Sequence, residues 1–203
     1  MSAAATSLPL FPLRTVLFPG GRMQLRVFEQ RYLDLVRDCT RTGGVFGVCL
    51  IVDGDEVGAA ATPAAIGTSA RIVDFDQLPD GLLGITIQGE DRFHADAARV
   101  RDNGLIIASA HWLPAPPAQR VAPEHGLLAR LLESLLEHDA GLPADVRQLD
   151  DADWVAWRLA ERLPMPTRDR QALLQLDDAG DRLDQVLAWL SRVDEPGSGI
   201  DPD

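Results

Sequence analysis

Short runs of alternating apolar and polar residues dominate the amino-terminal part of the chain and predict β-strands. Residues 22–28, RMQLRVF, alternate as a half-buried strand does, with Met23, Leu25 and Val27 on one face. Residues 44–52 instead form a continuous apolar run before an acidic turn. Such a run is typical of a strand that is covered on both faces.

One helix and a hairpin complete the pattern predicted for residues 1–113. Residues 29–39 place apolar side chains at helical spacing, and Gly43 supplies a stop. Residues 67–95 predict two strands that meet at a Pro-Asp-Gly turn, and residues 104–112 predict another strand. Six or so short strands separated by turns favour a closed or nearly closed barrel over a doubly wound sheet.

The opening run LPLFPLRTVLFPGG, residues 8–21, is apolar but interrupted by Pro9, Pro12 and Pro19. No basic residue precedes it and Arg14 lies inside it, so we expect neither a signal peptide nor a membrane span, and a cytoplasmic location. The prolines predict an entry strand with its first two prolines at an edge or irregular stretch, followed by a Pro-Gly-Gly turn.

The pattern changes to helical spacing after a proline-rich segment. Residues 114–122 predict an extended linker, and residues 123–193 predict a bundle of helices. The polar residues 194–203 are expected to be disordered. The chain is therefore predicted to have an α+β fold, with a β-barrel subdomain followed by a helical subdomain.

Charge narrows the range of partners. The 203 residues carry a net charge of -12, and all 19 basic residues are arginine. The acidic balance argues against nucleic acid and anionic membranes as partners, because affinity for phosphates rests on basic side chains. Without lysine, a P-loop lysine, a Ser-Lys dyad and a Schiff-base lysine are all excluded.

Candidate chemistry is sparse. Cys39 and Cys49 lack zinc-ligand spacing, and the four histidines are scattered along the sequence. We therefore expect buried thiols, no metal site and no cofactor. Asp150, Asp151 and Asp153 are interpreted as caps and first-turn charges of a helix, and Thr167 as the cap of another. No serine has the context of a nucleophile elbow, so no catalytic residues are predicted.

Several blocks, in this order, resemble the amino-terminal domain of Lon proteases. They are LPLFPLRTVLFPGGRMQLRVFEQRYLDLV, FGVCLI, GTSARIVDF, LPDGLLGITIQGEDRF, RLAERLPM and RQALLQLDDAGDRLDQVL. The resemblance is closest to free-standing bacterial proteins made of that domain alone. It implies a PUA-like barrel, a helical subdomain and a role as a receptor for unfolded or tagged proteins. The ATPase and Ser-Lys peptidase of full-length Lon proteases are expected to be missing.

Five residues near the opening blocks are candidates for polypeptide binding. Phe18, Met23 and Phe28 could present an apolar surface, with Phe18 the one most expected to be exposed because it lies in a loop. Arg14 and Arg31 could contact carboxylates or carbonyls of a bound peptide. The alternatives are packing in the barrel core for the apolar residues and local ion pairs for the arginines.

Three tryptophans form the second candidate group. Trp154 and Trp157 are three residues apart on a predicted helix, and Trp112 lies just before the linker. They could line a groove between the subdomains, although packing in the helical core is the alternative. Gly89, in the block GEDR, is expected to lie in a turn.

The sequence therefore favours a non-enzymatic module that binds unfolded or tagged polypeptides, or a protease partner, and that could form a homo-oligomer. Two alternatives remain: an RNA-binding PUA-like protein, and a hydrolase with an unrecognised site.

Overall fold

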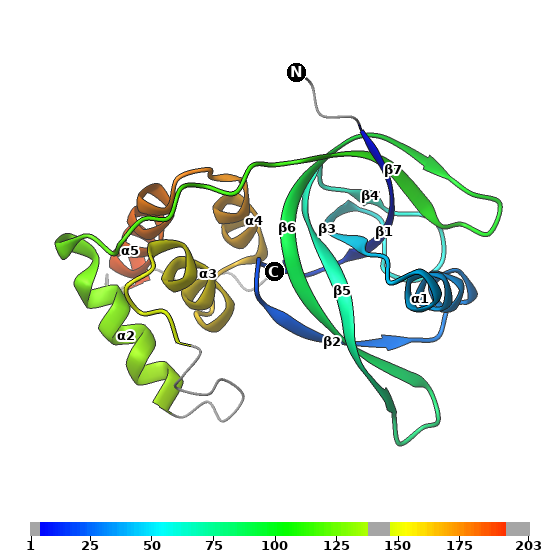
Figure 1. Cartoon of the computed structure of the whole chain (residues 1–203), viewed down its shortest axis with the longest axis horizontal. Coiled ribbons are helices and arrows are strands. Elements are labelled where there is room, and N and C mark those ends of the chain that lie inside the picture. The colour runs from blue at the N-terminus through cyan, green and yellow to red at the C-terminus, as the bar shows by residue number, and fades with distance from the viewer. Residues whose placement is uncertain (1–4, 138–146, 194–203) are drawn as a thin grey trace. The chain divides into compact units, whose positions relative to one another are not determined.

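The chain divides into two compact units in a computed structural model that describes residues 5–137 and 147–193. One unit extends to Ala115 and the other begins at Pro116, inside the predicted linker 114–122. Figure 1 shows strands and one helix in the described part of the first unit, and helices in the described part of the second. The predicted disordered tail, 194–203, lies outside the described residues.

The first unit contains seven strands and one α-helix among its described residues. They are β1 Thr6–Leu13, β2 Arg22–Val27, α1 Gln30–Thr42, β3 Phe46–Asp53, β4 Thr62–Pro63, β5 Ile66–Gln77, β6 Leu83–Val100 and β7 Ile106–Trp112. The pairing order β1-β7-β6-β5-β3 returns to β1, so these strands form a closed circuit. β2 lies outside the circuit and pairs with the first third of β6 (Figure 1).

β1 changes its partner between its two prolines. Thr6–Pro9 pairs antiparallel with β7, and Leu10–Leu13 pairs parallel with β3. Each half of β1 is thus hydrogen-bonded to a neighbouring strand on one side only, although β1 as a whole lies between β7 and β3. A proline can be accommodated in such a half-strand when its nitrogen faces the unpaired side.

The helix after β2 follows its sequence pattern. Its buried side chains include Tyr32, Leu35 and Val36, and Gly43 ends it in the left-handed conformation with φ of 65°. The ring of Tyr32 stacks on Phe11 from β1, with centroids 3.9 Å apart. Burying this amphipathic face against the strands stabilises the helix more than its intrinsic propensity does.

The prediction that Phe18 lies at the surface is wrong, since only 1% of this residue is exposed. The following Pro-Gly pair forms a tight turn in which Gly20 has φ of 72° and the Gly21 N–H donates to the Phe18 carbonyl over 3.0 Å. The turn docks on Gly89 through the Gly20 N–H and the Gly89 carbonyl, 2.8 Å apart. Docking the turn in this way leaves the phenyl ring inside the unit.

Gly89 does not lie in a turn, so that prediction is also wrong. It lies within β6, and its φ is not positive. A Cβ at this position would approach the Phe18 carbonyl oxygen to 2.3 Å. The glycine is needed for close approach between two backbones rather than for an unusual dihedral angle.

The second unit consists of helices. They are η1 Pro123–His125, α2 Gly126–Glu137, α3 Ala152–Arg162, α4 Thr167–Gln175 and α5 Ala179–Val193. Asp151 caps α3 as predicted, accepting a 2.8 Å hydrogen bond from the Trp154 N–H. Thr167 is not a cap: it is the first residue of α4, and Pro166 precedes it without a side-chain cap.

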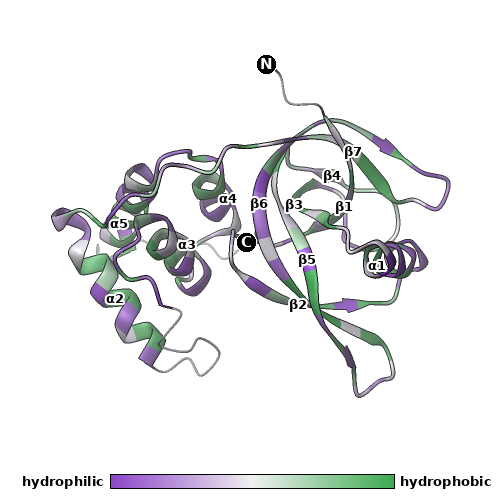
Figure 2. Cartoon of the chain, in the orientation of Figure 1, coloured by the Kyte–Doolittle hydropathy of each residue, from purple (hydrophilic) through white to green (hydrophobic). Residues whose placement is uncertain are grey.

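Helix α2 shows a wide apolar stripe, as the hydropathy colouring in Figure 2 illustrates. Leu128, Leu132 and Leu136 are fully buried. Leu127, one position earlier, is 66% exposed. The stripe is therefore wider than the described part of the unit covers.

Candidate functional site

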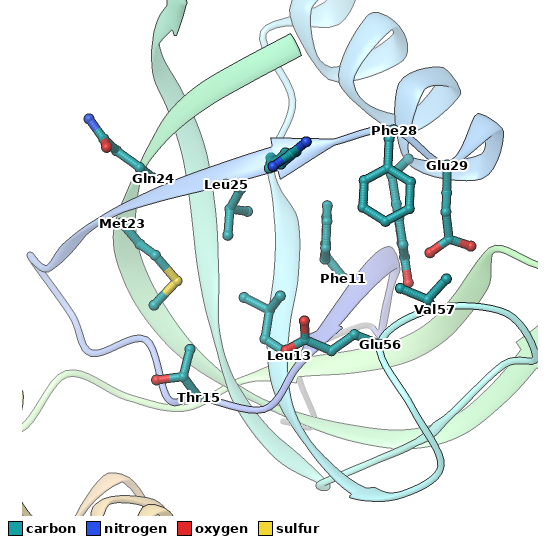
Figure 3. Close-up of a pocket in the computed structure, with 12 residues that line it drawn as sticks. Phe11, Leu13, Thr15, Met23, Gln24, Leu25, Phe28, Glu29, Glu56 and Val57 are labelled. Atoms are coloured by element: carbon teal, nitrogen blue, oxygen red, sulfur yellow. The ribbon is translucent and has the colours of Figure 1, made fainter. Parts of the chain in front are cut away.

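The first unit contains an open pocket of about 530 Å³ between β2, the end of β1 and the start of α1. Figure 3 shows its side chains converging from these elements and from the loop after β3. It is lined by Phe11, Leu13, Thr15, Met23, Gln24, Leu25, Arg26, Phe28, Glu29, Tyr32, Glu56 and Val57.

The inner wall of the pocket is apolar and part of the core. Phe11, Leu13 and Leu25 are each less than 10% exposed. The mouth is different, because Phe28 is 49% exposed and Val57 is 56% exposed. Exposed apolar side chains continuous with a hollow mark binding sites in soluble proteins.

Two arginines hold the loop that carries Glu56 and Val57. The Arg14 backbone N–H donates to Glu56 Oε1 over 2.6 Å, and its side chain pairs with Asp55 and donates to the Gly54 carbonyl over 3.0 Å. Arg31 is buried and donates to the Glu56 carbonyl over 3.4 Å. Both side chains therefore position the pocket wall.

The polar groups around the pocket leave one carboxylate without a cation. Arg31 pairs with Glu29 over 3.0 Å, and Arg26 pairs with Asp80. Within residues 5–137 and 147–193, Glu56 has no ion-pair partner, although its side chain lies at the pocket mouth (Figure 3). Burial raises the pKa of Tyr32, so its hydroxyl stays protonated at neutral pH.

The structure brings together four of the eight predicted site residues. Met23 and Phe28 line the pocket, and Arg14 and Arg31 support its wall. Phe18 is not available to a partner, as its burial shows. The two arginines do form local ion pairs, the alternative considered for them.

The tryptophans belong to different units. Trp112 is 36% exposed and lies edge-on to Phe93, with centroids 6.3 Å apart. Trp157 is buried, and the Arg182 guanidinium lies 4.1 Å from its ring centroid, so it packs in the helical core. Trp154 is half-buried. A groove shared by all three stays a prediction.

The loop residues Glu56 and Val57 are the part of the site that the sequence did not reveal. The only available signal was the acidic turn DGDEVG after an apolar run. Nothing in that pattern specifies which strand the turn approaches, because the loop is positioned by contacts with Arg14 and Arg31 from distant segments.

Other candidate chemistry is limited in the described part of the chain. No group of three or more His, Cys, Asp or Glu side chains there could hold a metal ion. Two histidines that are distant in sequence do meet: Asp96 lies 2.8 Å from His94 and 2.7 Å from His111. Among the described residues, no helix is long and apolar enough to cross a membrane.

Comparisons with known proteins agree on one family. Residues 7–192 match the ATP-dependent protease La (LON) substrate-binding domain. The crystal structure of a Lon N-terminal domain protein from Xanthomonas campestris is 52% identical, with a TM-score of 0.78, covering 91% of this chain and 98% of that one. The N-terminal domain of a Mycobacterium avium complex Lon protease shares the fold at 17% identity, with a TM-score of 0.69, covering 92% of this chain and 98% of that one.

Curated relatives are longer. Lon protease from Flavobacterium johnsoniae is 22% identical over 91% of this chain, and Lon protease 2 from Myxococcus xanthus is 28% identical over 93%. The chain spans 24% of the length of each. The matched family is that of the substrate-binding domain rather than of a catalytic domain.

Proposed function

Since the chain belongs to the family of Lon substrate-binding domains, we propose that it is a non-catalytic module that binds unfolded or tagged polypeptides through the pocket beneath β2. The observation that carries this proposal is the continuity between the apolar inner wall and the exposed Phe28 and Val57. A polypeptide in an unfolded state exposes the apolar side chains that such a surface would bury.

The same proposal includes the barrel and bundle architecture of the two units and the cellular location of the protein. The closed circuit of strands supports a PUA-like barrel over residues 1–113, and the five helical segments support a bundle over 123–193. A cytoplasmic setting is supported by two cysteines that are both free and buried. A protease that degrades the bound polypeptide would be a suitable partner.

Retention of an unfolded polypeptide tests the proposal. Fluorescence anisotropy of labelled, reduced and carboxymethylated α-lactalbumin should show saturable binding, and Phe28→Ser should weaken it. The matched control is Phe75→Ser, because Phe75 is 48% exposed but lies outside the pocket. Truncating an apolar anchor in an interface typically costs about 1–2 kcal/mol, roughly a tenfold weaker affinity.

Two results would contradict the proposal. One is the absence of saturable binding by the folded wild-type protein, and the other is an equal loss in the Phe28 and Phe75 variants. We also expect no degradation of casein with or without ATP.

A further inference from the structure

We propose that the free edge of β2 receives a bound polypeptide as an added β-strand, whose alternate side chains enter the pocket. This inference rests on the proposed function and specifies how the polypeptide is held. It commits to an extended segment that carries apolar residues and one Lys or Arg on the same face.

The first support is the backbone of β2. Within the described residues β2 pairs only with β6, in a regular register from Arg22 opposite Gln88 to Val27 opposite Leu83. One residue earlier, the Gly21 carbonyl accepts the Gly89 N–H over 2.8 Å. Backbone groups that face the partner alternate along a strand, so those of the odd-numbered residues face β6.

The N–H and C=O groups of Arg22, Gln24 and Arg26 therefore face away from β6. No backbone or side-chain group in the described part of the chain pairs with them. These donors and acceptors are spaced as in any extended backbone, so another polypeptide in an extended conformation can form hydrogen bonds with them.

The second support is the position of the pocket relative to this edge. The consecutive residues Met23 to Arg26 all line it, whereas a hollow on one face of a strand would contact alternate residues. A smaller hollow of about 230 Å³ on the β5–β6 side is also lined by Gln24, Leu25 and Arg26. The two hollows thus share three consecutive residues of β2.

Side-chain directions fit an added strand. Figure 3 shows Met23 and Leu25 pointing into the pocket and Gln24 pointing away from it. An added strand continues the sheet, so its side chains alternate between the same two faces. Its pocket-facing residues would lie over the apolar wall and near Phe28.

Charge identifies the occupant further. Glu56 at the pocket mouth lacks a cationic partner among the described residues, so a Lys or Arg on the pocket-facing side of the added strand would pair with it. A second copy of β2 is a poor occupant. Antiparallel self-pairing could place Arg22 opposite Arg26, and like charges directly opposite each other are destabilising.

Backbone-modified peptides test this mode. The probe is the acetylated, amidated peptide Val-Thr-Leu-Thr-Lys-Thr-Val, together with two analogues N-methylated either on the threonines or on the other residues. Only one of the two analogues should lose binding. If the peptide adds as an antiparallel strand, the analogue methylated on the threonines should not bind; if it adds as a parallel strand, the analogue methylated on the other residues should not bind. N-methylation removes the donors of one edge and leaves the opposite edge intact.

A pair of substitutions at one position tests the protein side. Gln24→Pro removes an outward N–H but none of the hydrogen bonds to β6, and it should weaken binding of the peptide and of unfolded α-lactalbumin roughly tenfold. Gln24→Ala removes the side chain and keeps the N–H, so it is the reference against which the tenfold weakening in Gln24→Pro is measured. Circular dichroism and thermal unfolding establish that both variants are folded.

The outcomes separate the two proposals. Strand addition is wrong, and pocket binding stands, if Phe28→Ser weakens binding while Gln24→Pro binds normally. The same conclusion follows if the protein binds the two methylated analogues with equal affinity. If the wild type binds neither probe, the proposed function itself fails. Self-association that is lost in Gln24→Pro would instead identify a second copy as the occupant and overturn the inference.

Discussion

Gly89 and Phe18 illustrate how single residues are set by contacts between distant segments. The opening turn can reach β6 only because residue 89 lacks a Cβ, which would otherwise lie 2.3 Å from the Phe18 carbonyl oxygen. The sequence shows the glycine and the phenylalanine but not their proximity. From local sequence alone, the glycine was therefore expected in a turn, and Phe18 was the apolar candidate most expected to be exposed.

Gly89→Ala should consequently destabilise the first unit. Overpacking against backbone typically costs about 1–3 kcal/mol in the free energy of unfolding. Urea unfolding followed by fluorescence would measure this cost. Gly126→Ala is the control, because a Cβ there meets nothing within 4 Å and the residue is helical. Equal stability of the two variants would show that the turn does not dock on β6 in solution.

The two thiols should be inert in the folded protein. Burial raises the pKa of Cys39 to about 11 and that of Cys49 to about 12. Alkylation by iodoacetamide at pH 8 should be slow in buffer and fast in urea, because the thiolate is the reactive species. Rapid alkylation of both thiols in native buffer would contradict this burial.

The same pKa shifts predict how stability depends on pH. The unfolded thiols release their protons near pH 9, before the folded ones do. Above that pH the unfolded state therefore binds fewer protons than the folded state, and the free energy of unfolding falls as pH rises. Cys39→Ser with Cys49→Ala should flatten this dependence between pH 9 and 11 in urea titrations.

At the scale of elements, local patterns predicted most of the secondary structure. β2, α1 and the capped α3 each follow from a repeat or a cap within a few residues, and the structure confirms them. The site depends on longer range: β2 supplies one wall, and a loop held by Arg14 and Arg31 supplies another. Met23 and Phe28 were predicted because they lie on or beside a recognisable strand, whereas Glu56 and Val57 lie in a turn with no local indication of its destination.

A buried arginine in α5 joins that helix to α3. Arg182 is fully buried, pairs with Asp153, donates to the Leu176 carbonyl over 2.5 Å and stacks on Trp157. Removing one partner of a buried ion pair costs about 3–5 kcal/mol, because the remaining charge is left without a counter-ion. The Asp153 side chain is 22% exposed, so the cost here lies at the lower end of that range.

Arg182→Ala should therefore lower the free energy of unfolding of the second unit by about 3 kcal/mol. Arg168→Ala serves as the control, since the Arg168 side chain is 79% exposed and its carboxylate neighbour is 3.8 Å away. Thermal unfolding monitored by tryptophan fluorescence is suitable because Trp157 contacts the substituted residue. A similar small change in both variants would contradict the assigned role.

At the scale of the whole molecule, the two units differ in charge and in content. Residues 1–113 contain 10 arginines and 13 acidic residues, a net of -3, while residues 114–203 contain 9 and 18, a net of -9. The pocket and the free edge of β2 lie entirely in the first unit. The acidity is therefore concentrated in the helical unit, whereas the proposed binding surface belongs to the first unit.

This division predicts that polypeptide binding belongs to the first unit alone. A protein comprising residues 1–115 retains every pocket-lining residue and the closed circuit of strands, so it should fold. Its affinity for unfolded α-lactalbumin should lie within about threefold of that of the full chain, a difference of less than about 1 kcal/mol in binding free energy. The matching protein of residues 116–203 should not bind it. Anisotropy titrations would compare the three proteins, with circular dichroism as the test of folding. A folded first unit that fails to bind, alongside a full chain that does, would place the contact surface in the helices, where Leu127 already presents an exposed apolar side chain.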